Sequence, residues 1–395
     1  MIGAVPSGWR ETTLGRVLQR SPSYGINAPA LPRGVGRYPY LRITDIDEAG
    51  RVDFGALPSV RDSASDVFVL SDGDIVVART GASVGKSHLF KDQGEPVVFA
   101  GFLIRLSADR DAIIPDYLAQ FMQTAQYWDW IRENSARSGQ PGVNGQQLQT
   151  IPFVLPPLHE QQAIAAALSD ADGVVAGLER VIAKKRLIKQ GAMQDLLTAR
   201  RRLPGFSGDW EVKRLGDICR LDMGGTPSRR NSAFWGKGYP WLTIADMQSK
   251  VIYSSKEQLT DEGAALLTPV KAGTLIMSFK LSIGRLAFAG VDLFTNEAIC
   301  SFNDLGEDPD FLFYALGRTD FALYGKQAVK GYTLNKQSLK EVEVFMPEKR
   351  EQQAIAAVLA DMDAEIQTLE SRLTKARAVK EGMMQNLLTG RVRLV

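Results

Sequence analysis

Few side chains in this sequence could support catalysis or bind a metal. The chain has two histidines, His88 and His159, and two cysteines, Cys219 and Cys300. A structural zinc site needs about four closely spaced ligands, which these residues do not provide. Two cysteines about 80 residues apart form no CxxC pair and no disulfide framework, so a reducing, cytoplasmic compartment is expected. A histidine acting as general acid or base would also lack a recognisable partner.

Three short motifs resemble nucleotide-binding sites but depart from them. GASVGKS (81–87) has three residues between its glycines, whereas a P-loop has four. We predict a tight turn there, with positive φ at Gly81 and Gly85. GVGRYP, from Gly34, lacks the third glycine of a dinucleotide fingerprint. DPDF (308–311) differs at its third residue from the (D/N)PP(Y/F) of adenine methyltransferases. The sequence therefore predicts no bound cofactor, no metal and no active site.

The chain contains one unit twice. Residues 144–203 match residues 335–394 without gaps, and 28 of the 60 positions are identical. EQQAIAA occurs in both copies, at 160–166 and 351–357. A weaker repeat precedes it, in which YPYLRITD matches YPWLTIAD and DGDIVVARTGASVGK matches AGTLIMSFKLSIGR. We interpret this as a duplicated scaffold with variable segments and a nearly constant C-terminal part.

The constant part predicts a long helix in each copy. Neither 160–198 nor 351–389 contains proline, and Gly390 stands where the second helix should end. Apolar residues recur with 4-3 spacing, which indicates a heptad seam. The seam residues are Ile164, Leu168, Ala171, Val175, Leu178 and Ile182, and in the second copy Ile355, Leu359, Met362, Ile366, Leu369, Leu373 and Ala376. Each helix could pack on its own domain, or the two could pack on each other, antiparallel if a two-fold relates the units.

The remaining segments predict mixed domains. DGDIVVAR, VVFAGFLIRL, GTLIMSF and EAICSF are typical of short strands. Residues 116–131 and 310–325 are expected to be helical. The predicted fold is α+β, with two mixed α/β domains joined by two long helices that form an antiparallel coiled coil with internal pseudo-two-fold symmetry. The predicted segments are 1–157, 158–203, 204–347 and 348–395.

Composition and charge exclude several classes of protein. The 395 residues include 47 basic and 45 acidic side chains, for a net charge of +2. No apolar run approaches the roughly 20 residues of a membrane span, and the N-terminus does not resemble a signal peptide. We therefore expect a soluble, cytoplasmic protein without a membrane partner. Residues 1–150 carry 15 basic and 16 acidic groups, and residues 204–346 carry 16 and 17.

These motifs together resemble the specificity (S) subunit of type I restriction–modification systems. Each copy begins with a Trp…Leu-Gly segment and ends with EQQAIA, a long helix and LLTxR. GGTPSR (224–229), YPWL and GDIVVARTGASVGK lie between them. The resemblance covers essentially the whole chain. The twice-repeated EQQAIA–helix–LLTxR unit is its most specific part.

The resemblance implies a function without catalysis. Two target-recognition domains, 1–157 and 204–347, would each read one half of a split sequence in double-stranded DNA. The central helix (158–203) and the distal helix (348–395) would set the gap and dock two methyltransferase (M) subunits. The M subunits would bind S-adenosylmethionine and methylate adenine at N6. Restriction (R) subunits would add ATP- and Mg-dependent translocation and cleavage.

Base recognition needs hydrogen-bonding side chains on exposed loops, and four sets of loops supply them. The candidates in the first domain are Arg42, Thr44, Arg79, Thr80, Ser83, Lys86, Arg137, Gln140 and Asn144. Those in the second domain are Thr226, Ser228, Arg229, Arg230, Thr243, Lys280, Ser282, Arg285, Lys330, Tyr332, Thr333 and Asn335. Each polar side chain could instead bond its own turn, and each basic one could be a solvated surface charge.

The long helices also leave two interpretations open. Arg180, Lys184, Lys185, Arg186 and Lys189 could face DNA or solvent. The off-seam apolar residues are Leu187, Met193, Leu196, Met384 and Leu387, and they could dock partner helices or belong to the cores. The alternative function is a non-catalytic scaffold whose two domains bind protein partners, which would suit their near-neutral charge.

Overall fold

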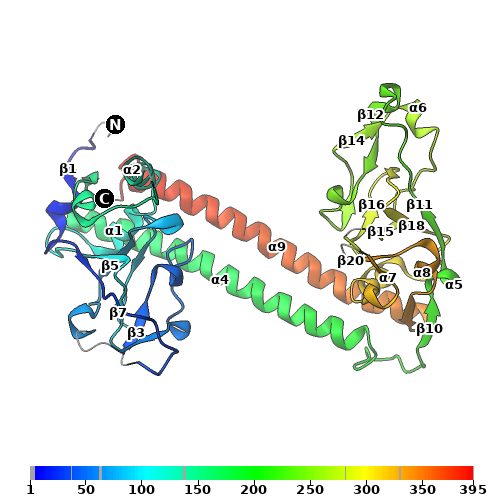
Figure 1. Cartoon of the computed structure of the whole chain (residues 1–395), viewed down its shortest axis with the longest axis horizontal. Coiled ribbons are helices and arrows are strands. Elements are labelled where there is room, and N and C mark those ends of the chain that lie inside the picture. The colour runs from blue at the N-terminus through cyan, green and yellow to red at the C-terminus, as the bar shows by residue number, and fades with distance from the viewer. Residues whose placement is uncertain are drawn as a thin grey trace. The chain divides into compact units, whose positions relative to one another are not determined.

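The computed structural model describes residues 5–36, 38–61, 65–136, 139–280, 282–328 and 331–394, without the side chains of 326–333. The chain forms two compact units (Figure 1). The first contains Met1–Glu179 and Ser371–Val395, and the second contains Arg180–Glu370. Each unit therefore combines one mixed domain with one half of each long helix, so the units cut across the four segments predicted from sequence.

The first unit has a four-stranded sheet, β2-β8-β5-β6, a three-stranded sheet, β4-β3-β7, and the pair β1-β9. Its strands are β1 (Arg10–Thr13), β2 (Ser23–Tyr24), β3 (Tyr38–Leu41), β4 (Ser59–Val60), β5 (Asp74–Ala78), β6 (Ser87–Leu89), β7 (Val98–Phe99), β8 (Leu103–Ser107) and β9 (Pro152–Leu155). Its helices are α1 (Pro115–Phe121), α2 (Ala125–Ser135), α3 (Gly145–Gln149) and the first half of α4 (Leu158–Leu196).

The second unit repeats this plan with a five-stranded sheet, β11-β18-β15-β16-β13, a three-stranded sheet, β14-β12-β17, and the pairs β10-β21 and β19-β20. Its strands are β10 (Glu211–Arg214), β11 (Arg220–Met223), β12 (Trp235–Leu242), β13 (Val251–Ile252), β14 (Glu257–Leu259), β15 (Leu275–Ser278), β16 (Leu286–Ala289), β17 (Phe294–Thr295), β18 (Ile299–Asn303), β19 (Lys326–Ala328), β20 (Gly331–Thr333) and β21 (Glu343–Met346). Its helices are α5 (Leu215–Ile218), α6 (Asp261–Ala264), α7 (Pro309–Leu316), α8 (Lys336–Lys340) and the first half of α9 (Lys349–Leu387).

The predicted strands form, but the two predicted domain helices are wrong in extent. Residues 116–131 form two helices. The first ends at Phe121, whose carbonyl accepts the Thr124 hydroxyl at 2.7 Å, and that hydroxyl accepts the Tyr127 amide at 3.3 Å at the start of the second. Residues 310–325 hold only α7, followed by a 3-10 turn that Asp320 caps. In both places a short polar side chain competes with the helical backbone for hydrogen bonds, which apolar periodicity does not reveal.

The two long helices pack antiparallel, as the seam predicted. In the first unit Asp172 and Glu179 of α4 pair with Lys380 and Arg377 of α9, with N–O distances of 2.6 and 2.7 Å. Residue numbers thus rise along one helix as they fall along the other. The second unit repeats these pairs with the helices exchanged, as Lys189–Asp363 and Arg186–Glu370. The predicted α+β class with an antiparallel helix pair is confirmed.

Both predicted packing modes of the helices occur. The first turns of α4, with Ile164 and Leu168, join the core of the first domain together with Leu387 from the end of α9. The first turns of α9 and the end of α4 join the core of the second domain in the same way. Farther along, seam residues such as Leu178 and Leu369 are only partly buried. Each helix therefore packs on a domain at its ends and on its partner helix between them.

A buried glutamate at the start of each long helix fastens three segments together. Glu160 has no exposed surface and accepts hydrogen bonds from Trp9 Nε1 at 2.9 Å and Arg393 Nη2 at 2.7 Å. Trp9 lies at the start of the first domain, and Arg393 follows α9. We call this set the glutamate clamp. The clamp of the second unit contains Glu351, Trp210 and Arg202, with distances of 3.2 and 2.6 Å.

The glutamine that follows each clamp glutamate joins the same helix to its domain. Gln161 accepts the Ile114 amide at 2.8 Å and donates to the Pro156 carbonyl at 2.9 Å. Gln352 accepts the Asp308 amide at 2.9 Å and donates to the Pro347 carbonyl at 2.9 Å. The first Glu-Gln of each EQQAIAA repeat is therefore explained by the attachment of a helix to its domain.

The residue that follows the last turn of each long helix differs between the two copies. Gly390 has φ of +68°, the left-handed conformation that ends many helices and favours glycine. The matching residue of the first copy is Ala199, which has φ of +58°. An alanine in this region is strained because its Cβ approaches the following carbonyl.

We expect Glu160→Gln to destabilise the first unit by about 1–2 kcal/mol, because Arg393 and Trp9 lose a charged acceptor. Burial raises the pKa of Glu160, but hydrogen bonds from Arg393 and Trp9 outweigh it and hold that pKa below 4.5. The stabilisation is therefore present above pH 4.5 and is lost as the pH falls through the lower folded-state value.

Hydrogen exchange of the β9 and α1 amides at neutral and acidic pH measures this effect. The variant should show a weaker acid dependence than the wild type. Glu133→Gln, at an exposed position, is the matched control. It should change neither the stability of the first unit nor the acid dependence of its exchange. Equal acid dependence in wild type and Glu160→Gln would contradict the role of the clamp.

Ala199→Gly should stabilise the second unit by up to about 1 kcal/mol, because it relieves the left-handed alanine. Gly390→Ala should act in the opposite direction, since a Cβ there would also lie 2.5 Å from Pro6 Cγ. Urea unfolding of both variants measures the two changes. Destabilisation by Ala199→Gly would mean that the Ala199 methyl contributes more by packing than it costs in strain.

Candidate nucleic-acid interface

Two loops of the first domain that the sequence named separately lie together. Arg79–Ser83 follows β5, and the Gly81 amide donates to the Pro141 carbonyl at 2.9 Å. The Val143 amide donates to the Arg79 carbonyl at 2.9 Å, so the two loops share a short ladder. Gly81 and Gly85 have φ of +72° and +88°, which confirms the predicted turn.

One hydrogen-bond donor of Arg79, its Nε, has no partner among the described residues. Its guanidinium carbon lies 4.7 Å from the centre of the Tyr24 ring, and Tyr24 in turn accepts the Gly145 amide at 3.1 Å. Nε of Arg79 is buried and has no hydrogen-bond partner among the described residues. Stacking on Tyr24 orients the guanidinium, but because Nε is buried, an incoming acceptor reaches that donor only if the surrounding loops move.

Two other candidate cations of the first domain are already paired. Arg42 forms a two-pronged contact with Asp45, at 3.0 and 2.8 Å, and this hydrogen bonding raises the pKa of Arg42. Lys86 Nζ lies 2.6 Å from Glu48, whose side chain is 91% exposed. The Lys86 pair is therefore the easier one for a competing anion to open.

Three candidate polar side chains cap their own turns. Asn144 accepts the Gln147 amide at 2.8 Å, and Asn335 accepts the Ser338 amide at 2.8 Å. Thr243 donates to Asp246 at 2.7 Å while Asp246 accepts the Thr243 amide. The sequence left open that such polar side chains bond their own turns, and these three do. The capping hydrogen bond occupies one acceptor of each asparagine.

Arg229 of the second domain is held in an aromatic and acidic cage. Its guanidinium carbon lies 3.9 Å from the Trp235 ring centre and 4.7 Å from that of Trp241. Its Nη2 donates to Glu257 at 2.9 Å, which raises the pKa of Arg229 and lowers that of Glu257. The neighbouring Arg230 is exposed and has no partner among the described residues.

Glu297 joins two further candidate loops. Thr226 donates to its carboxylate at 2.5 Å, and this hydrogen bond is the main reason why the pKa of Glu297 is lowered. Lys280 and Arg229 lower it further by their charge. Thr226 and Arg229 of the 224–230 loop and Lys280 of the loop after β15 therefore all act on one carboxylate. Arg285 adds a long contact, 3.4 Å, to the Ile244 carbonyl beside Thr243.

The other candidates are mostly surface residues. Thr44, Gln140, Ser228, Ser282 and Arg285 are exposed, and Thr80 and Ser83 are half-buried. Arg137 and Lys330 lie outside the described residues, as do the side chains of Tyr332 and Thr333. Among the described residues, no side-chain hydrogen bond or ion pair joins Arg42 or Thr44 to Arg79, Thr80, Ser83 or Gln140.

Sequence reasoning missed the residues that hold these cations. They are Tyr24, Glu48, Trp235, Trp241, Glu257 and Glu297. Trp235, in a variable segment, and Trp241, in the YPWL motif, were a usable signal, since Arg commonly stacks on indole rings. The acidic partners had none, because they are distant in sequence from the residues that they bind.

The residues with possible chemistry show no catalytic arrangement. His88 is hydrogen-bonded through Nδ1 to the Gly50 carbonyl at 2.8 Å, and burial lowers its pKa. Cys219 and Cys300 are free and buried, and burial raises the pKa of each thiol to about 12. Within the described residues we find no His, Cys, Asp or Glu group suited to a metal ion, and no helix apolar and long enough to cross a membrane.

Two domains of similar plan, each with a helix pair and a cluster of polar and basic loops, define a duplicated recognition protein. The chain belongs to the family of the type I restriction modification DNA specificity domain, whose model matches it twice, at residues 6–185 and 207–376. It is thus of the specificity-subunit class, and the two copies correspond to two target-recognition domains.

Known relatives agree with this assignment. The putative type I restriction enzyme MjaX specificity subunit of Methanocaldococcus jannaschii is 26% identical, over 100% of this chain and 96% of its own. The MjaIX specificity subunit of that organism is 32% identical over 39% of this chain and 38% of its own. The type I restriction-modification S subunit of M. genitalium has a similar fold, with a TM-score of 0.62, 14% identity and coverage of 98% and 97%.

Removal of Arg229 should loosen its loop, whereas removal of Arg230 should not. We expect Arg229→Ala to change the tryptophan emission spectrum and to increase proteolysis within residues 224–231, because Trp235 and Trp241 lose their stacked cation. Arg230→Ala is the matched control and should leave both unchanged. Identical spectra and cleavage rates for the two variants would show that the cage does not order this loop.

Proposed function

We propose that the chain is the sequence-specific DNA-recognition subunit of a type I restriction–modification complex. Each domain reads one half of a bipartite target, and the chain itself catalyses no reaction. The observation that carries this proposal is the two-fold match to a DNA specificity domain, combined with loop clusters that differ between two otherwise similar domains. Similar scaffolds with different loops are suited to reading two different half-sites.

The proposed readers are the cations with free or easily freed donors. Arg79 is half-buried and stacked on Tyr24, and Arg230 is exposed and unpaired among the described residues. Arginine binds guanine edges through two hydrogen bonds. Arg229, by contrast, is proposed to position the loop that carries Arg230, because it is already bound to Glu257 and two indoles.

The charge of the domains suggests that partners strengthen DNA binding. Phosphate contacts normally dominate affinity for DNA, yet each domain has one more acidic than basic group within 1–150 and 204–346. Many cations are also paired, including Arg42 and Lys86. We therefore expect weak binding by the isolated chain and tight binding by its complex with methyltransferase subunits.

The long helices are proposed to set the gap and to dock two M subunits. Each has 39 residues, which corresponds to about 58 Å. Leu187 and Ile188 of α4 are 68% and 46% exposed, and Val379 of α9 is 61% exposed. Exposed apolar groups on a helix are typical of protein contacts. Of the off-seam residues, Leu196 and Leu387 instead belong to the cores.

The chemistry is assigned to the partners. M subunits would bind S-adenosylmethionine and methylate adenine at N6, and R subunits would use ATP and Mg for translocation and cleavage, with the whole complex in the cytoplasm. The scaffold for protein partners alone is not favoured, because the family model that matches both domains is a DNA specificity domain.

Methylation mapping tests the proposal directly. Co-expression with the cognate methyltransferase should place N6-methyladenine in a split motif with a constant gap. Exchange of residues 6–157 for those of a relative should change one half only, and exchange of 204–347 should change the other half. A stable complex with an active methyltransferase that adds no new methylation would refute the DNA-recognition role.

A further inference from the structure

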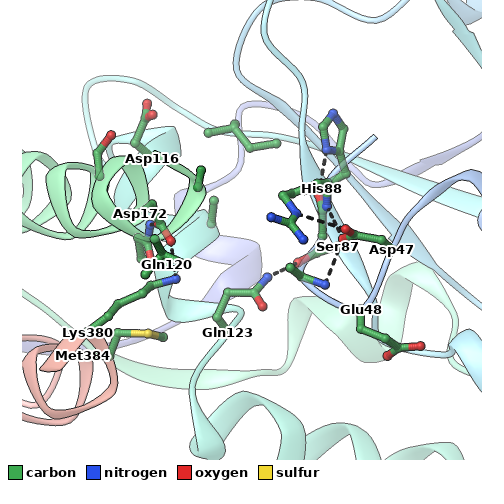
Figure 2. A pocket seen from close by; sticks show the side chains of 18 of the residues that line it. Asp47, Glu48, Ser87, His88, Asp116, Gln120, Gln123, Asp172, Lys380 and Met384 are labelled. Carbon is green, nitrogen blue, oxygen red and sulfur yellow. Dashed lines mark hydrogen bonds and ion pairs between the residues drawn. The ribbon is translucent and has the colours of Figure 1, made fainter. Parts of the chain in front are cut away.

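The first unit contains a cavity of about 960 Å³ whose charged side chains are largely paired within the chain (Figure 2). Lys380 pairs with Asp172, and Gln120 donates to the same carboxylate at 2.8 Å. Asp116, which also lines the cavity, pairs with Lys91 at 2.9 Å. Groups with free hydrogen-bonding capacity and exposed apolar surface lie instead on a turn of the same domain.

This turn joins β7 to β8 and has Gly101 and Phe102 at its centre. The Leu103 amide donates to the Ala100 carbonyl at 2.9 Å, which closes the turn. Phe102 is 58% exposed, so its ring gains little from burial in the folded domain. The Phe102 carbonyl accepts the Arg79 amide at 3.0 Å. The turn therefore adjoins the loop that carries the candidate residues 79–83.

Asn27 lies against the same turn. The Gly101 amide donates to the Ile26 carbonyl at 2.8 Å, and a Cβ on Gly101 would lie only 1.9 Å from Asn27 Oδ1. Glycine at this position therefore leaves the space that the Asn27 carboxamide occupies. Asn27 is exposed, and its side chain makes no hydrogen bond among the described residues. A free carboxamide and an exposed ring thus belong to one small surface.

The second domain has a matching turn, with Glu297 and Ala298 at its centre. The Ala298 carbonyl accepts the amide of the residue after β15 at 2.9 Å, as the Phe102 carbonyl accepts the amide of the residue after β5. Ala298 is therefore the counterpart of Phe102, and Glu297 is the counterpart of Gly101.

The same comparison makes Thr226 the counterpart of Asn27. The residue before each, Gly225 or Ile26, donates its amide to a carbonyl of the adjoining strand, β17 or β7, at 2.8 and 2.9 Å. Thr226 donates to Glu297 at 2.5 Å. This place on the scaffold therefore carries a hydroxyl and a carboxylate in the second domain, and a carboxamide and a phenyl ring in the first.

A carboxamide beside an apolar ring is complementary to the major-groove edge of an A·T base pair. Adenine presents the N7 acceptor beside the N6 donor, and asparagine binds both with two hydrogen bonds. The paired thymine presents a methyl group, which suits apolar contact with a phenylalanine. Guanine presents two acceptors and cytosine has no methyl group, so a G·C pair would leave the amide oxygen without a partner and the ring without its contact.

We propose that Asn27 and Phe102 are specificity-determining residues of the first domain that together recognise an A·T base pair, Asn27 by binding the adenine and Phe102 by contacting the thymine methyl group. Gly101 is a positioning residue, because its missing side chain makes room for the Asn27 amide. This inference rests on the proposed DNA-recognition function and names one base pair that the first domain reads.

Binding of base-analogue duplexes by the full chain in complex with its methyltransferase tests the inference. The duplexes carry the target found by methylation mapping, and each thymine of the half-site read by the first domain is replaced in turn by deoxyuridine, which lacks the methyl group. Fluorescence anisotropy should show one replacement that weakens wild-type binding about fourfold, the value of one buried methyl group. The same replacement should leave binding by the Phe102→Ala complex unchanged.

The adenine contact is tested in the same way. Replacement of the paired adenine by 7-deazaadenine, which lacks the N7 acceptor, should weaken wild-type binding about tenfold. It should leave binding by the Asn27→Ala complex unchanged. Gly101→Ala should reproduce the loss of 7-deazaadenine sensitivity, because its Cβ displaces the Asn27 amide.

Two control variants remove an exposed side chain of each kind elsewhere in the first unit. Asn386→Ala removes an amide and Val67→Ala removes an apolar group, and both should keep the wild-type sensitivity to the two analogues. A wild-type complex that distinguishes the target from a scrambled duplex but responds to neither analogue would overturn the inference alone, as would analogue effects that persist in Phe102→Ala and Asn27→Ala. Equal binding of target and scrambled duplexes by the wild-type complex would instead contradict DNA recognition itself.

Discussion

The buried carboxylate at the start of each long helix is the interaction on which the rest of the structure depends. A carboxylate without exposed surface is tolerated only when it is paired and hydrogen-bonded. Glu160 and Glu351 obtain their partners from the end of the other helix and from the first residues of a domain. One charge thus fixes helix to helix and helix to domain.

The glutamate clamp is made by residues with different sequence separations in the two units. In the second unit Arg202 and Trp210 lie on one continuous connection after α4. In the first unit the same contacts are made by Arg393, near the end of the chain, and Trp9, near its beginning. The two units therefore have equivalent attachments, although the residues that make them lie close together in the sequence in one unit and far apart in the other.

Between these attachments the two domains differ mainly in the side chains of their exposed loops. The central strands β5 and β8 in one unit and β15 and β18 in the other are buried, whereas the loops carry Arg79 on Tyr24 in one and Arg229 on two tryptophans in the other. The same divergence reaches the helix–domain boundary, where the carboxylate at the start of α7, Asp310, pairs with Lys250, and the matching Asp116 of α1 pairs with Lys91. Common attachments therefore allow each domain to present different chemistry.

The sequence by itself determined the duplication, the long helices, their seam and the strand-forming runs, because these follow from local periodicity and from identity between copies. The helix breaks at Thr124 and Asp320, the partners of Arg79 and Arg229, and the clamp were decided only by tertiary structure. A side chain such as Glu297 or Trp9 contacts residues tens to hundreds of positions away, and no local pattern encodes such a distance. The composition of the loops was readable from sequence, but which of their charges are already neutralised was not.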